Sequence, residues 1–225
     1  MSFFVKLTES GEYDLTSAGY TAVIVLMLLI VCVACFLTSR ENDVRFGTRK
    51  LVFSAMAMAL AYVTSFIKLI HMPMGGAVTL FSMLFITLIG YWYGLKTGLL
   101  VAFAYGLLQF VTGPYIVSIP QVLCDYILAF GALGLSGIFY EKKHGLVLGY
   151  VVGVIGRFFF SFLSGFIFFA DYAPPEMNPA VYSFVYNGAY LFAEAAITVA
   201  VLLVPAVEKG LRSVKNMAFH QLERA

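Results

Sequence analysis

The chain of 225 residues is 61% hydrophobic and 12% charged, with a mean hydropathy of +0.92 and a formal net charge of +2. These values lie outside the range of soluble globular domains and indicate an integral membrane protein. The three cysteines fall inside apolar segments without the spacing of a zinc site, and no low-complexity run divides the chain. The composition therefore argues against a soluble enzyme, a disulfide-rich secreted domain and a nucleic-acid-binding protein.

Most of the apolar segments reach the roughly 20 helical residues that a hydrocarbon core of about 30 Å requires. Residues 1–17 lack the basic start and the clear cleavage site of a signal peptide, so we expect the first apolar segment to be retained. The pattern predicts seven membrane-spanning helices, at residues 18–37, 51–70, 77–93, 97–111, 120–140, 146–169 and 182–207.

The basic residues between these segments predict the orientation of the chain. Eleven of the 14 Lys and Arg residues fall in alternate connections or in the tail, which places them on one side of the membrane. Because basic connections stay in the cytoplasm, we expect the amino terminus outside and the carboxyl terminus inside. The basic residues concerned are Arg40, Arg45, Arg49, Lys50, Lys96, Lys142, Lys143, Lys209, Arg212, Lys215 and Arg224.

One acidic side chain, Asp125, interrupts the apolar segment 120–140, with Gln121 four residues earlier and Tyr126 beside it. An ionised carboxylate inside a membrane costs several kcal/mol unless it meets a cation, a donor or water. Asp125 is therefore either a ligand contact or a partnered structural charge. If its helix enters from outside near Pro120, the carboxylate lies about one to two turns deep.

Two further charged residues are expected near the middle of the membrane, Arg157 and Glu194. Each is costly alone, so the sequence favours a structural ion pair between them over a proton relay.

Other polar and aromatic residues should share the outer depth of Asp125. Ser161 and Phe169 lie in the outer half of one predicted helix, and Tyr182 and Asn187 at the outer start of the next. A carboxylate, aromatic walls and an amide would suit a flat, cationic solute that enters from outside. The alternative is ordinary packing, because the chain contains 14 Tyr and 22 Phe.

Alanines recur four residues apart in the segment SAMAMALAY, as Ala55 and Ala59 and as Ala57 and Ala61. Small residues at this spacing allow close approach of another helix. The pattern is equally compatible with an internal packing face and with an interface for a partner.

The sequence contains no nucleotide-binding loop, no HExxH and no nucleophile-elbow turn, so we expect no enzyme activity, no resident cofactor and no metal.

Several motifs together resemble the thiamine-specific S-component family (ThiT/YuaJ) of the energy-coupling-factor (ECF) vitamin transporters. They are GGAVTL at 75–80, YGLKTGLLVAFAYGLLQF at 93–110, PQVLCDYILAFGALGLSG at 120–137, and RFFFSFLSGFIFF with VYSFVYN between Arg157 and Asn187. The resemblance covers residues 51–207. It implies an all-α membrane protein with a six-helix S-component-like bundle at 48–207. Hydropathy and charge add an extracellular segment, an extra transmembrane helix and a basic cytoplasmic loop at 1–47, and a cytoplasmic tail at 208–225. The extra first helix departs from the family, which usually has both ends in the cytoplasm.

The resemblance also implies a function. It predicts a substrate-binding subunit in the bacterial cell membrane that captures thiamine or a related cationic vitamin from outside, with a transmembrane coupling subunit and two ATPases as partners. By position, Asp125 resembles the acidic residue facing the cationic ring of thiamine, and Tyr126 its aromatic neighbour. Tyr182 and Asn187 match the family's tyrosine and asparagine ligands, and Ala55, Ala59 and Ala61 its docking face.

Four positions depart from the family pattern, and two of them, Ser118 and Ile127, stand where the family has a histidine in the outer loop and a proline after the acidic–Tyr pair. Ser161 stands where the family has a ligand histidine, and Phe169 where it has a stacking tryptophan. These departures leave room for a related substrate. A stand-alone proton-coupled vitamin transporter, with Arg157, Glu194 and Asp125 as the relay, is the alternative function.

Overall fold

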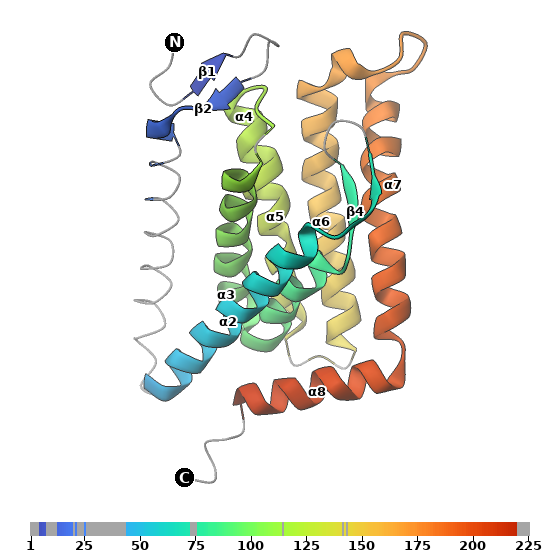
Figure 1. The fold of residues 1–225 in the computed structure, drawn as a ribbon. Helices are drawn as coiled ribbons and strands as arrows, with labels where there is room; N and C mark the ends of the chain where they lie inside the picture. Colours follow the sequence, from blue (N-terminus) through green and yellow to red (C-terminus); the bar gives the residue numbers. More distant parts are fainter. Residues whose placement is uncertain are drawn as a thin grey trace.

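In the computed structural model, long helices stand side by side as a bundle, and one further helix, α8, crosses its base (Figure 1). The structure describes residues 5–7, 13–19, 21, 25, 44–72, 76–113, 115–140, 142 and 144–219. Most of the first predicted span, 18–37, therefore lies outside the described residues. The described helices are α2 (Val44–Ser65), α3 (Ser82–Thr112), α4 (Ile119–Val122), η2 (Leu123–Leu128), α5 (Ala129–Gly131), η3 (Ala132–Phe139), α6 (Gly145–Phe168), η4 (Ala170–Tyr172), α7 (Pro179–Leu202) and α8 (Pro205–Phe219).

Within the described part of the chain, four helical stretches are long and apolar enough to cross a membrane. They are α3, the continuous run from α4 to η3, α6 and α7. The chain is therefore a mostly helical, multi-pass membrane protein, as the composition predicts.

Helix α3 is interrupted at Gly94, which has φ 84° and ψ 177°. Gly90 and Gly98 would be about 12 Å apart in an unbroken helix, yet a Cβ added to Gly98 would lie 2.7 Å from the Gly90 Cα atom. The chain therefore reverses direction at Gly94, where a positive φ favours glycine. This reversal separates the two helices that the sequence predicts at 77–93 and 97–111.

A short antiparallel hairpin corrects the ends of the two helices predicted at 51–70 and 77–93. Strand β3 (Lys68–His71) pairs with β4 (Ala77–Thr79), so α2 ends at Ser65 and α3 begins at Ser82. At the end of α2, the Ser65 hydroxyl donates a hydrogen bond to the Tyr62 carbonyl oxygen at 2.7 Å. An apolar run of this length does not distinguish a strand from a helix, which explains the error. A second hairpin, β1 (Val5–Leu7) with β2 (Tyr13–Leu15), lies at the end of the bundle where α4 begins (Figure 1).

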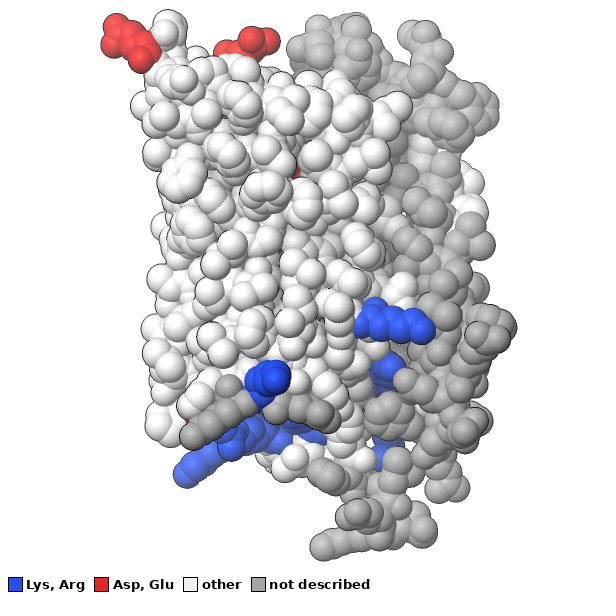
Figure 2. Space-filling view, turned by 180° about the vertical axis from the view of Figure 1, so that it is seen from behind, with Lys and Arg blue, Asp and Glu red and all other residues white. Residues whose placement is uncertain are grey.

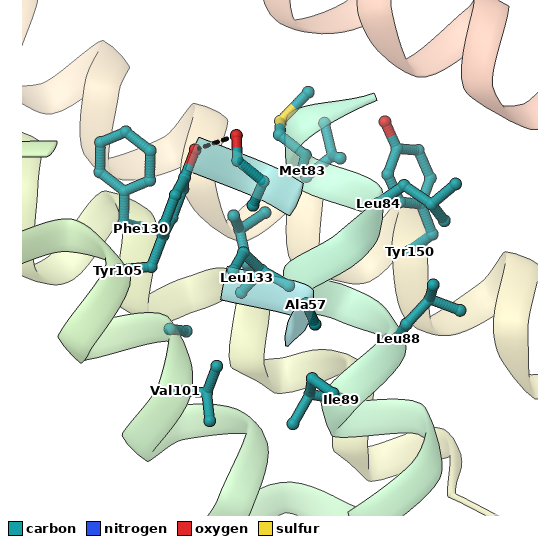
Figure 3. Packing of buried hydrophobic residues seen from close by; sticks show 14 of the residues in the cluster. Ala57, Met83, Leu84, Leu88, Ile89, Val101, Tyr105, Phe130, Leu133 and Tyr150 are labelled. Carbon is teal, nitrogen blue, oxygen red and sulfur yellow. Dashed lines mark hydrogen bonds between the residues drawn. The ribbon is translucent and has the colours of Figure 1, made fainter. Parts of the chain in front are cut away.

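The core lies where α2 crosses α3. The Tyr105 hydroxyl donates a hydrogen bond of 3.1 Å to the Ala61 carbonyl oxygen, and the Tyr105 ring packs edge-on against Phe130 (Figure 3). Ala61 is fully buried, and Leu133 fills the space between the elements. This contact fixes the angle of α2 across the bundle.

Within the segment 208–225, which we expect to be a cytoplasmic tail, the chain is helical as far as Phe219. Helix α8 runs across the base of the bundle (Figure 1), and its buried side chains include Ala218. The Lys215 ammonium group lies 4.1 Å from the centre of the Tyr91 ring. One side of this helix therefore packs on the bundle.

Charge is distributed unevenly between the two ends. On the face shown in Figure 2, Lys and Arg gather toward the α8 end, and prominent acidic side chains stand at the opposite end. The described connections at the α8 end carry Lys96 and Lys142, whereas the connection from α6 to α7 carries Asp171 and Glu176.

Candidate functional site

A cavity of about 340 Å³ lies in the half of the bundle away from α8. It is enclosed by the hairpin β3–β4, the last turn of α3, the segment from α4 to η2, the second half of α6 and the first half of α7. All seven residues that the sequence predicts as substrate-binding line this cavity. They are Gln121, Asp125, Tyr126, Ser161, Phe169, Tyr182 and Asn187.

Asp125 lies in η2, a stretch of wider π-helical turns in which the backbone bonds are shifted by one residue. Such turns are rare and are frequent at functional sites. The Gln121 side-chain amide donates a hydrogen bond of 2.6 Å to one carboxylate oxygen of Asp125, and its carbonyl oxygen accepts one from the Val117 N–H at 3.1 Å. Within the described chain, no Lys or Arg forms an ion pair with Asp125, whose carboxylate therefore belongs to the cavity wall.

Both ends of the Gln121 side-chain amide are occupied by groups of the protein. Its side chain is only 1% exposed, and its own N–H bonds to the Ser118 hydroxyl at 3.3 Å. The hydrogen bond from Gln121 therefore fixes the position of the Asp125 carboxylate.

Aromatic residues close the end of the cavity that is farthest from α8. Tyr115 stacks on Phe169 with ring centres 5.7 Å apart, and its hydroxyl lies 2.7 Å from that of Tyr172. The Tyr115 N–H donates to the Tyr126 hydroxyl at 3.0 Å. These contacts join the connection before α4 to the connection after α6.

Helix α7 supplies an amide and a row of tyrosines. The Asn187 amide nitrogen donates to the Ser183 carbonyl oxygen at 3.0 Å, and its oxygen accepts from the Tyr190 hydroxyl at 2.9 Å. Tyr182 stacks on Tyr186 with ring centres 6.0 Å apart. Asn187 is thus oriented by its own helix and faces the cavity from there.

The structural ion pair expected between Arg157 and Glu194 is absent, although both residues are described and both line the cavity. The Glu194 carboxylate instead accepts hydrogen bonds from the Thr79 N–H at 2.8 Å and the Thr79 hydroxyl at 2.7 Å. It also faces the Met83 N–H at 3.4 Å, in the first turn of α3. The expectation fails because a hairpin absent from the predicted fold supplies the donors that Glu194 needs.

The Arg157 guanidinium lies over the Phe130 ring, 4.1 Å from its centre. Its Nε atom is buried and has no hydrogen-bond partner within the described residues. Arg157 is therefore a cation of the cavity wall rather than half of an ion pair.

The sequence reasoning missed the residues that the hairpin brings to the cavity, which include Lys68, Gly76 and Thr79. The Tyr186 hydroxyl accepts a hydrogen bond of 3.0 Å from the Gly76 N–H, so α7 holds both the hairpin and the cavity wall. It also missed Tyr115, Tyr186 and Tyr190. The spacing of Tyr182, Tyr186 and Tyr190, each four residues apart on one helix, is the signal that could have found the last two.

The predicted partner face on α2 is divided by the structure. Ala55 and Ala59 are exposed, whereas Ala57 is 7% exposed and Ala61 is fully buried against α3. Ala61 cannot touch a partner in this arrangement, which corrects its assignment.

Among the described residues, no cluster of His, Cys, Asp and Glu could hold a metal ion.

The fold and the cavity define a class: a multi-pass helical membrane protein with a cavity lined by polar and aromatic side chains toward one end of the bundle. Residues 51–212 match the family model for the thiamine transporter protein (Thia_YuaJ). The chain belongs to this thiamine transporter family.

Named relatives agree with this membership. The chain is 31% identical over 176 residues to the thiamine transporter ThiT of Bacillus subtilis, covering 70% of this chain and 91% of that protein. It is 25% identical over 169 residues to ThiT of Lacticaseibacillus paracasei, covering 67% and 81%. A solved structure of ThiT from Listeria monocytogenes matches with a TM-score of 0.58 and 26% identity, covering 70% of this chain and 96% of that one.

Proposed function

We propose that this protein is the substrate-binding membrane subunit, or S-component, of an ATP-driven vitamin importer, and that it captures thiamine from outside the cell. Membership of the thiamine transporter family and the names of the relatives support thiamine as the substrate. The cavity volume of about 340 Å³ falls in the range of small-molecule sites, about 300 to 1,000 Å³.

The observation that carries the proposal is the position of Asp125. Its carboxylate lines the cavity, accepts one hydrogen bond from Gln121 and has no ion-pair partner in the described part of the chain. A half-buried carboxylate in this position stabilises a cation that enters the cavity, because the attraction is stronger where water is scarce. The thiazolium ring of thiamine is such a cation, and Tyr126, Phe169 and Tyr182 provide aromatic surfaces for its two flat rings.

The orientation of the chain fits capture from outside. The basic connections and α8 lie at the end of the bundle opposite to the cavity. With that end in the cytoplasm, the cavity faces the exterior, as does the β1–β2 end of the chain. The sequence has no nucleotide-binding loop. In the proposed importer, separate ATPases and a membrane coupling subunit supply the energy for transport, with the exposed Ala55 and Ala59 of α2 as a contact for the coupling subunit.

The experiment compares ligands of different charge on the purified protein and on Asp125→Asn. We expect the substitution to lower the affinity for thiamine by at least about tenfold, since hydrogen bonds to charged groups contribute about 1.5–3 kcal/mol. The affinity for a neutral thiophene analogue of thiamine should fall much less. An equal loss for both ligands would show that Asp125 supports the fold rather than the cation.

A further inference from the structure

Positive charge gathers at the end of the bundle that carries α8 (Figure 2). Among the residues whose side chains the structure describes, the elements and connections at this end carry one acid, Glu208, and a larger set of bases. The bases are Arg49, Lys50, Lys96, Lys142, Lys209, Arg212 and Lys215. Glu208 forms an ion pair with Arg212 at 2.6 Å and so compensates only one of them.

Arg49 is a base at this end for which the described chain supplies no acceptor. Its side chain is half-buried near the start of α2, and its Nη1 atom is buried without a hydrogen-bond partner. The hydrogen bonds and ion pairs of the described residues include none from Arg49. A guanidinium that is partly withdrawn from water and lacks an acceptor is unfavourable, so this position favours an anion from outside the chain.

Aromatic contacts place Arg49 where α2, the reversal in α3 and the end of α8 meet. Phe53, one turn after Arg49, packs edge-on against Trp92 with ring centres 6.2 Å apart. The charge of Arg49 is close enough to act on the hydroxyl of the neighbouring Tyr93. The Tyr93 ring in turn lies 5.3 Å from the ring of Phe219. A guanidinium beside this aromatic layer offers a planar fork of donors, which matches two oxygens of a phosphate group.

Helix α8 has the surface of a helix that lies among lipid headgroups. Lys209 and Arg212 are exposed on it, and so are large apolar side chains at both of its ends, Leu203 and Val204 before it and Met217 near its last turn. At a membrane interface such apolar side chains reach the acyl chains while the basic side chains reach phosphates. With the proposed orientation, this end faces the cytoplasmic leaflet, whose anionic lipids attract basic segments.

We propose that Arg49 binds the phosphate of an anionic phospholipid of the cytoplasmic leaflet, so that a lipid headgroup occupies the corner between α2, the α3 reversal and α8. Lys50 follows Arg49, and Lys96 follows the reversal at Gly94, so both add positive charge around this corner. The proposed site is separate from the cavity, which lies in the other half of the bundle. It uses the proposed orientation and does not depend on the proposed substrate.

The test uses the intrinsic fluorescence of Trp92, which is the only tryptophan of the chain and packs on Phe53 one turn from Arg49. The full chain is placed in phosphatidylcholine vesicles that contain increasing fractions of a lipid with brominated acyl chains, which quenches a nearby tryptophan. The brominated lipid is either phosphatidylglycerol or phosphatidylcholine. We expect phosphatidylglycerol to bind at least about fivefold more tightly, the factor that one basic residue at an anionic surface provides.

A matched pair of arginine variants tests the site itself. Arg49→Gln should lower the preference for phosphatidylglycerol by at least about threefold, and Arg49→Lys, which keeps the charge, should retain part of it. Arg212→Gln removes the same group from an exposed position paired with Glu208, and should change the preference by less than about 1.5-fold. The thermal unfolding midpoint in phosphatidylcholine shows whether each variant is folded. The unmodified protein and Arg49→Lys keep the test decisive if Arg49→Gln does not fold.

Three results would overturn the proposal. The first is the absence of any preference for phosphatidylglycerol in the unmodified protein, and the second is an equal loss of preference in Arg49→Gln and Arg212→Gln. The third is displacement of the brominated phosphatidylglycerol by inorganic phosphate, which would assign the site to a free ion. None of these readouts involves thiamine, so a failure of the proposed function is distinguished from a failure of the lipid site.

Discussion

At the scale of single residues, the sequence reasoning located the cavity well and assigned some charges wrongly. Asp125, Tyr126 and Asn187 share one cavity, because a carboxylate or amide at that depth must face a polar space. The partner of Glu194 could not be found in the same way. The donors to Glu194 are the backbone N–H and the hydroxyl of Thr79, which is 115 positions away in the sequence. The β3–β4 hairpin brings Thr79 to Glu194, and hydropathy does not predict this hairpin.

Gln121 lines the cavity and also donates a hydrogen bond to Asp125, so we propose that it supports this carboxylate. Gln121→Met keeps the side-chain volume and removes the amide. We expect it to lower the affinity for thiamine by about tenfold, since a hydrogen bond to a charged group contributes about 1.5–3 kcal/mol. Calorimetry with thiamine and with its neutral thiophene analogue is the measurement. A loss of the same size for the neutral analogue would contradict a role through the carboxylate.

At the scale of elements, helices were predicted more accurately than the segments between them. Helix α6 spans Gly145–Phe168, against a prediction of 146–169, because a long apolar run in a membrane has no alternative to a helix. The hairpin β3–β4 was missed, since its pairing is a contact between two short segments. The helical face of α8 was also overlooked, although apolar residues recur along it at helical spacing.

Helix α2 offers a matched pair of alanines for testing its two faces. Ala61→Leu should destabilise the protein by about 1–3 kcal/mol, because the added atoms enter the packed space beside Tyr105. Ala59→Leu, on the exposed face, should leave the thermal unfolding midpoint and thiamine affinity unchanged and reduce co-purification of the coupling subunit. Equal thermal effects of the two substitutions would contradict the division of this helix into an inner and an outer face.

At the scale of the whole molecule, the important features are the place of the cavity and the place of the basic connections. The cavity lies at one end of the bundle, and the basic connections lie at the other. The class of protein and its family could be predicted from the sequence, because hydropathy and motifs are local. The closure of the cavity by the hairpin could not, because it depends on how distant segments pack.

The orientation leads to a labelling experiment in intact cells. In a background in which Cys32, Cys35 and Cys124 are replaced by alanine, a cysteine at Glu176 should react with a membrane-impermeant maleimide. A cysteine at Ser213, exposed on α8, should react only after the cells are opened. The reverse pattern would place the cavity on the cytoplasmic side and remove the basis for capture from outside.

The central claim is that this protein alone, without ATP or partner subunits, binds thiamine in the cavity that contains Asp125. Isothermal titration of thiamine into the purified protein tests it most directly. We expect one site per chain with a dissociation constant well below about 1 μM, since Asp125 and several aromatic rings contribute together. Absence of measurable heat with thiamine and with its phosphate esters, for a protein shown to be folded, would contradict the claim.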